Sequence, residues 1–134
     1  MKRRLFADTS GIFAAYWSHD RRHAEASHYL RDRPELVTHR LIVIETVSLL
    51  TKRLSRFHAE AWSEVFHRCH AANVREFDLQ VYREAEGFWR AHHHKEWDLI
   101  DCYSFVLMKM EGLKEVPTFD HHFRQAGFTA PLVP

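Results

Sequence analysis

Four acidic residues occupy positions where a carboxylate is either unusual or expected to reach a shared site. Asp8 and Asp120 each end a short apolar run. Glu45 and Asp101 lie within or at the start of strongly apolar segments with helical spacing, where a solvated carboxylate is normally excluded. Four carboxylates in one pocket repel one another, which raises some of their pKa values unless cations compensate. We therefore interpret the four residues as candidate ligands of a divalent metal ion.

The expected ion is Mg²⁺ or Mn²⁺, because carboxylate oxygens are hard ligands that these cations prefer. One or two such ions can orient a water molecule, lower its pKa and neutralise the charge that grows on a phosphodiester during in-line displacement. Hydrolysis of a phosphodiester is therefore the predicted chemistry. An aspartyl-phosphate phosphatase is excluded, because the second acid of its DxD pattern is replaced by Ser10, two residues after Asp8.

Each acid also has a simpler structural interpretation. An isolated acid at the end of a strand often caps the following helix, and this applies to Asp8 and Asp120 taken singly. A cap does not explain Glu45 in the middle of an apolar helix, although a buried ion pair with Arg40 or Lys52 would. From the residue pattern alone, both the metal pocket and these structural roles stay open.

Several polar neighbours could support the acids without being ligands. Asp98 lies one helical turn before Asp101, and we interpret it as the N-cap of the helix that starts at Leu99 rather than as a fifth acid of the pocket. Ser10 and Thr118 could place hydroxyl groups beside Asp8 and Asp120 as orienting residues. His121 and His122 adjoin Asp120, but the chemistry does not require a histidine.

The elements that must position these residues alternate between strands and helices. Strands are expected at 5–7, 36–38 and 73–77, and a further one at 116–119, either beginning after Pro117 or running at an irregular edge. Residues 127–134 form a final strand or tail. Helices are expected at 12–17, 20–31, 41–54, 58–72, 79–92, 99–110 and 121–126. This alternation predicts an α/β architecture with a mainly parallel sheet whose carboxyl ends share one edge.

Length and composition indicate one ordinary globular domain. The chain has 134 residues, of which 46% are hydrophobic and 28% are charged, and its formal net charge is +1; one domain over residues 1–134 is therefore expected. Any site for a polyanion must be local, because no global positive field exists. No signal-peptide pattern follows the basic start, and the longest apolar run, 11–17, is too short to cross a membrane. We expect a cytoplasmic chain.

Four segments resemble the motifs of one known family, and they occur in the family's order. Residues 5–10 (LFADTS) resemble the opening motif of PIN domains, especially VapC-like toxins of type II toxin–antitoxin systems. Residues 43–50 (VIETVSLL) and 98–105 (DLIDCYSF) resemble the helices that carry the family's second and third acids. Residues 118–123 (TFDHHF) resemble the closing motif. Each motif is weak alone, whereas four in order across nearly the whole chain are specific.

The resemblance implies a three-layer α/β/α fold and places the family's metal-binding acids on Asp8, Glu45, Asp101 and Asp120. It also implies a Mg²⁺- or Mn²⁺-dependent endoribonuclease that acts as a toxin, forms a homodimer and binds a small antitoxin covering the acidic pocket. Two other functions stay open at this point. One is a housekeeping RNA-processing nuclease, and the other is a non-catalytic PIN-like module that binds RNA or protein.

Basic residues and cysteines complete the set of candidates. Lys52, Arg53 and Arg56 follow the Glu45 helix and form either a phosphate-binding rim or a plain solvated helix end. Cys69 and Cys102 fit neither a disulfide framework nor a metal knuckle, and we expect both to be buried free thiols.

Overall fold

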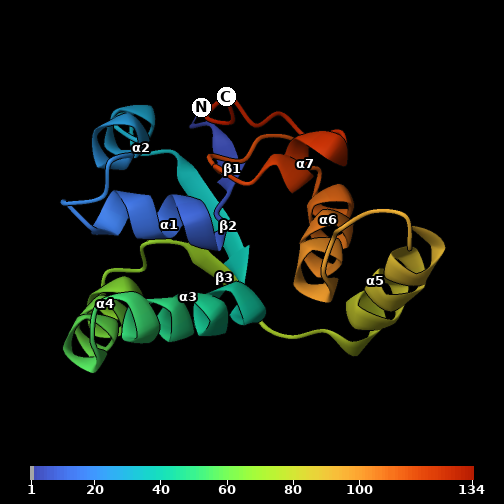
Figure 1. Cartoon of the computed structure of the whole chain (residues 1–134), viewed down its shortest axis with the longest axis horizontal. Helices are drawn as coiled ribbons and strands as arrows, with labels where there is room; N and C mark the ends of the chain where they lie inside the picture. Colours follow the sequence, from blue (N-terminus) through green and yellow to red (C-terminus); the bar gives the residue numbers. More distant parts are fainter. Residues whose placement is uncertain (1) are drawn as a thin grey trace.

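A small parallel sheet with helices on both sides forms the framework of the chain (Figure 1). The computed structural model describes residues 2–134. Its elements follow in the order β1 (Arg4–Phe6), α1 (Thr9–Tyr16), α2 (His23–Tyr29), β2 (Glu35–His39), α3 (Arg40–Arg53), α4 (Arg56–Arg68), β3 (Asn73–Arg75), α5 (Leu79–Ala91), α6 (Leu99–Glu111) and α7 (His121–Gln125). The predicted alternation of strands and helices is confirmed, with shifts of a few residues at the ends of elements.

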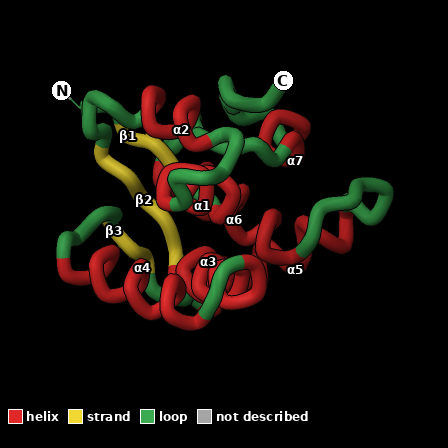
Figure 2. Tube along the Cα trace, turned by 60° about the vertical axis from the view of Figure 1, so that its left-hand side comes forward, coloured by secondary structure: helices red, strands yellow, loops and turns green. Residues whose placement is uncertain are grey.

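The three strands lie side by side and in parallel, in the order β1-β2-β3 (Figure 2). Leu5 pairs with Leu36 in the first ladder, and Thr38 pairs with Val74 in the second. Because all three strands run in the same direction, their carboxyl ends meet at one edge of the sheet. Asp8 follows β1 at this edge, and α3 begins there directly after β2.

The strand predicted at 116–119 is absent. In its place the chain makes only an isolated parallel bridge between Glu115 and Thr129, and the Glu115 carbonyl accepts the Phe6 amide at 3.0 Å. Pro117 has no N–H to donate to a ladder, and the Thr118 amide turns back to the Val116 carbonyl at 3.0 Å. The segment therefore passes beside β1 as an irregular strap, and residues 127–134 continue as a tail.

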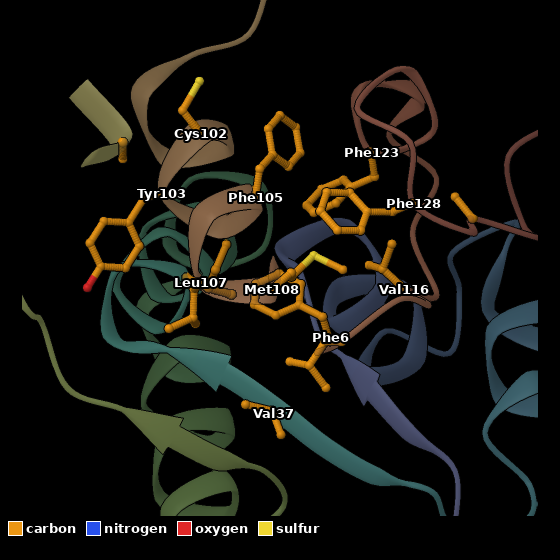
Figure 3. Packing of buried hydrophobic residues seen from close by; sticks show 14 of the residues in the cluster. Phe6, Val37, Cys102, Tyr103, Phe105, Leu107, Met108, Val116, Phe123 and Phe128 are labelled. Atoms are coloured by element: carbon orange, nitrogen blue, oxygen red, sulfur yellow. The ribbon is translucent and has the colours of Figure 1, made fainter. Parts of the chain in front are cut away.

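Hydrophobic clusters on the two faces of the sheet give the predicted three layers. On one face, Phe6 and Val37 pack against Phe105 and Met108 of α6 and against Phe123 of α7 (Figure 3). The other cluster joins α1, α3 and α4 through Phe13, Val43, Leu50, Ala59, Trp62 and Phe66. Each large side chain buried in this way stabilises the fold by about 1.5–3 kcal/mol. Trp62 and Phe66 are thus primarily core residues.

Two local expectations, on the cap at Asp98 and on the cysteines, have clear outcomes. Asp98 is the N-cap of α6, as predicted, and Gly112 ends that helix with a left-handed φ of 69°. Cys102 is buried, but the expectation that Cys69 is buried is wrong, because α4 ends at Arg68 and leaves the thiol exposed. Within residues 2–134, no helix combines the length and the apolar character that a membrane span requires.

Candidate active site

A cavity of about 440 Å³ opens at the carboxyl edge of the sheet, and all four predicted acids line it. Each acid comes from a different element. Asp8 lies between β1 and α1, Glu45 lies on α3, Asp101 on the first turn of α6, and Asp120 just before α7. Residues that are 112 positions apart in the chain, from 8 to 120, are therefore brought to one hollow.

Asp8 is the most buried of the four acids, with 4% of its surface exposed. Its carboxylate caps α1 by accepting the Gly11 amide at 3.1 Å, and it accepts the hydroxyls of Thr118 at 2.7 Å and Ser10 at 3.2 Å. Burial raises the pKa of Asp8 to about 7, and the charge of Asp120 also raises it, whereas these hydrogen bonds lower it. Asp8 is therefore both a cap and a wall of the cavity.

Glu45 is a half-buried carboxylate held by a hydroxyl group rather than by a cation. Thr9 donates its hydroxyl to Glu45. Burial raises the pKa of Glu45, and the nearby charges of Asp98 and Asp120 raise it further. The alternative of a buried ion pair with Arg40 or Lys52 is wrong, because Arg40 pairs with Glu76 at 2.6 Å and Lys52 makes no ion pair within residues 2–134.

Asp101 completes a reciprocal cap at the start of α6. Its amide donates to Asp98 at 2.7 Å, and its carboxylate accepts the Asp98 amide at 3.3 Å. Its Oδ2 also lies 2.9 Å from Nδ1 of His122. Burial raises the pKa of Asp101 to about 6, assisted by the charges of Asp98 and Asp120. Asp98 itself is exposed and does not line the cavity, which favours its interpretation as a cap.

Asp120 caps α7 and stands beside two histidines. Its carboxylate accepts the His122 amide at 2.9 Å, and its own amide donates to the Thr118 hydroxyl at 2.9 Å. Within the described residues 2–134, one group of three metal-ligating side chains has all its ligand atoms within 4.8 Å of one another, and it consists of Asp120, His121 and His122. The structure thus adds His122 to the site, which the sequence singled out only as a neighbour of Asp120.

The donor set fits a hard divalent cation. Neither Asp8 nor Glu45 has an ion pair with any side chain in the described part of the chain. Burying a carboxylate without a compensating charge is unfavourable, and the raised pKa values of Asp8 and Glu45 express that cost. Oxygen donors with a deficit of positive charge are what Mg²⁺ or Mn²⁺ requires.

Two arginines also line the cavity, namely Arg22 just before α2 and Arg53 at the end of α3. Of the three basic residues predicted as a rim, Arg53 alone reaches the cavity. Arg56 lies within 3.5 Å of Glu60 and borders a different hollow. Arg22 was not predicted as a site residue, because nothing in the residue pattern distinguishes it from its neighbour Arg21.

Comparison with known proteins agrees with this geometry. The PIN domain family model matches residues 5–129. The chain belongs to the PIN domain family. This PIN domain is 27% identical over 125 residues to the "23S rRNA-specific endonuclease VapC20" of Mycobacterium tuberculosis. The alignment covers 92% of this chain and 95% of the relative.

Solved structures share the fold over almost the full length. A crystal structure of Mycobacterium tuberculosis VapC20, described as a "Sarcin-Ricin loop cleaving toxin", superposes with a TM-score of 0.86 at 25% identity, covering 93% of this chain and 96% of that one. FitAcB from Neisseria gonorrhoeae has the same fold, with a TM-score of 0.69 at 17% identity and 94% coverage of both chains. The predicted three-layer PIN fold is thereby confirmed.

Proposed function

We propose that this PIN domain is a Mg²⁺- or Mn²⁺-dependent endoribonuclease that hydrolyses RNA phosphodiester bonds and acts as the toxin of a toxin–antitoxin pair. The observation that carries the proposal is the convergence of Asp8, Glu45, Asp101 and Asp120 on one cavity, where, within residues 2–134, neither Asp8 nor Glu45 has a cationic side chain as partner. The similarity to VapC20, whose name describes a 23S rRNA-specific endonuclease, supports RNA as the substrate class.

The four carboxylates would hold the divalent ion. Such an ion supplies an activated water and neutralises the charge that develops on the phosphodiester. The neighbours of the carboxylates fix their orientation: Thr118 and Ser10 donate to Asp8, and Thr9 donates to Glu45. His122 holds Asp101 from the side of α7. Orienting contacts of this kind change metal affinity or activity by about 10–100-fold when they are removed.

The partner chemistry follows from the same cavity. A toxin that cleaves cellular RNA must be held inactive by an inhibitor, and a small antitoxin that inserts a basic side chain among the carboxylates would neutralise this cavity. VapBC from Salmonella typhimurium, a solved structure bound to DNA, shares the fold with a TM-score of 0.66 at 14% identity. The same proposal includes a small antitoxin as partner, a homodimeric state and a cytoplasmic location.

The deciding experiment compares purified wild-type protein with Asp101→Asn on a panel of RNAs that includes 23S rRNA and its sarcin–ricin loop. We expect cleavage by the wild type in Mg²⁺ or Mn²⁺, no cleavage in chelator, and a loss of at least about 100-fold in Asp101→Asn. Asp78→Asn is the matched control, because Asp78 is exposed and caps α5, and asparagine retains the cap. It should cleave like the wild type.

Two results would contradict the proposal. Equal cleavage by the wild type and Asp101→Asn would show that the nuclease activity does not come from this cavity. RNA binding without cleavage, unaffected by chelator and by Asp8→Ala, would instead identify a non-catalytic PIN-like module. Expression of the wild type without a partner should arrest growth, and co-expression of the product of an adjacent small reading frame should relieve the arrest. A harmless wild type that still cleaves RNA would indicate a housekeeping nuclease.

A further inference from the structure

Within the described residues 2–134, the two arginines of the cavity lack the carboxylate partners that Arg3, Arg40 and Arg75 have. Arg3, Arg40 and Arg75 make ion pairs of 2.7, 2.6 and 2.5 Å. Within residues 2–134, neither the Arg22 nor the Arg53 guanidinium has an ion pair or a hydrogen bond to protein, even though five carboxylates line the same cavity. Their N–H donors are thus left available for a ligand.

Aromatic rings, rather than acids, hold both guanidinium groups. The Arg22 Cζ lies 4.6 Å from the ring centroid of Phe119, and the Arg53 Cζ lies 5.5 Å from that of Phe13. A guanidinium over a ring face gains cation–π attraction while its planar fork of N–H donors stays available for a bidentate anion. Both rings also line the cavity. The contacts therefore position the two cations without neutralising them.

The two arginines reach the cavity from different elements. The ring of Phe119, on which Arg22 stacks, directly precedes Asp120 in the chain. Arg53 lies eight residues after Glu45 on α3, about 12 Å along the helix axis at the rise of an α-helix. Arg22 is directed there by a turn in which the Asp20 carboxylate accepts the Arg22 amide at 2.7 Å. Asp20 thus contacts the backbone of Arg22 and not its guanidinium.

The net charge of the cavity lining indicates a role for the two guanidinium groups. Its lining holds five carboxylates, from Asp8, Asp20, Glu45, Asp101 and Asp120, and two guanidinium groups, a formal balance of 2 − 5 = −3. An RNA strand brings a phosphate on each side of the scissile one, and these phosphates meet a surface that repels them. Unpaired arginines on two separate elements offer the bidentate partners that phosphate groups prefer.

We propose that Arg22 and Arg53 form two phosphate-binding subsites that hold phosphates of the RNA backbone next to the scissile phosphodiester. This inference rests on the proposed ribonuclease function and describes how the same cavity binds its substrate. The two arginines are positioning residues, because they bind non-reacting phosphates and leave the chemistry to the carboxylates. Backbone contacts of this kind are independent of base sequence and lower affinity uniformly when they are removed.

Binding is measured first, so that the test does not depend on cleavage. In the Asp101→Asn background, Arg22→Gln and Arg53→Gln are titrated with a fluorescent single-stranded RNA at several salt concentrations. We expect each substitution to weaken binding about tenfold and to reduce the slope of log affinity against log salt by about 0.7. Arg21→Gln and Arg56→Gln are the matched controls, because both arginines are exposed and lie outside the cavity. They should leave the slope unchanged.

Conservative variants separate a binding role from a structural one. Arg22→Lys and Arg53→Lys keep the charge but lose the planar fork, so the salt slope should be retained while affinity falls. In the otherwise wild-type enzyme, the glutamine variants should raise KM and leave kcat within about twofold, as expected for uniform binding. Thermal melts of every variant establish that it is folded.

Two outcomes would overturn the inference. One is that the glutamine variants at 22 and 53 bind RNA with the same affinity and salt slope as those at 21 and 56. The other is that kcat falls while KM and binding stay unchanged. The binding comparison does not require the wild type to cleave RNA, so failure of the subsites and failure of the ribonuclease proposal give different results.

Discussion

The Thr118 hydroxyl donates to the Asp8 carboxylate at 2.7 Å across 110 residues of chain. The same hydroxyl oxygen accepts the Asp120 amide at 2.9 Å. One side chain therefore couples the acid that follows β1 to the acid that precedes α7. Because Thr118 is fully buried, this coupling is shielded from water and fixes the relative position of the two carboxylates.

Replacing Thr118 by valine removes the hydroxyl and preserves the shape. We expect Thr118→Val to weaken Mg²⁺ or Mn²⁺ binding about 10–100-fold, because Asp8 loses the strongest of the hydrogen bonds that oppose its raised pKa. Thr118→Ser keeps the hydroxyl and should bind metal nearly as well as the wild type. Isothermal titration of both proteins with Mn²⁺ measures the difference. Equal affinities for the valine and serine variants would refute the orienting role.

His122 offers a prediction about pH. Its Nδ1 lies 2.9 Å from Asp101 and favours the ionised carboxylate, whose pKa is nevertheless raised to about 6 by burial. Without this contact the pKa of Asp101 should rise further, so the acidic limb of the pH–activity profile of His122→Leu should move to higher pH. His122→Asn can still donate from a similar position and should restore part of the shift. Profiles for the two variants that coincide would count against this contact.

Asp8 predicts how the stability of the metal-free protein depends on pH. Its pKa rises from 3.8 unfolded to about 7 folded, so between these values the folded chain keeps a proton that the unfolded chain has released. The stabilisation is complete below pH 3.8 and is lost as pH rises to about 7. A shift of about three units corresponds to a loss on the order of 4 kcal/mol.

The measurement compares the wild type with Asp8→Asn in chelator, by urea denaturation across that pH range. His39 has the opposite effect on the pH dependence of stability. Burial lowers its pKa to about 3, so the folded protein is destabilised as pH falls below about 6.5, where the unfolded chain binds a proton that the buried imidazole does not. Both proteins contain His39, so their difference isolates Asp8. The asparagine variant should gain stability relative to the wild type as pH rises, and Mn²⁺ should stabilise the wild type far more. Parallel pH curves would contradict the assigned pKa.

Much of this site could be predicted from sequence because its strongest signals are local. An acid after a short apolar run and an acid inside an apolar helix are visible within about ten residues. The helix caps at Asp98 and Asp120 follow from equally short patterns. The prediction of a strand at 116–119 was wrong because the path of this strap depends on contacts between distant residues. The Phe6 amide donates to the Glu115 carbonyl, just before the strap.

What the sequence could not supply are contacts between distant segments. Thr9 holds Glu45 across 36 residues, and Arg22 meets the ring of Phe119 only once α2 and the strap are in place. No spacing rule relates such positions, because loop geometry sets their distance. The unpaired state of Arg22 is likewise invisible in the chain, since it depends on Asp20 being used by the backbone.

Gly11 provides a stability prediction that also reaches the site. A Cβ at Gly11 would lie 2.0 Å from the Pro117 carbonyl oxygen, which is backbone and cannot swing away. Gly11→Ala must therefore push α1 from the strap that carries Thr118, and we expect it to lower the free energy of unfolding by about 1–3 kcal/mol. Metal affinity should fall with it, because Asp8 caps α1 through the Gly11 amide.

Gly87 is the matched control for this substitution. It lies inside α5, and a Cβ there would meet nothing within 4 Å. Gly87→Ala should raise the free energy of unfolding by about 0.5–1 kcal/mol, because alanine restricts the unfolded chain and favours the helix. Urea denaturation and Mn²⁺ titration of both variants should give effects of opposite sign on stability and a loss of affinity only at position 11. A stabilising Gly11→Ala would show that α1 and the strap are less tightly apposed than the structure describes.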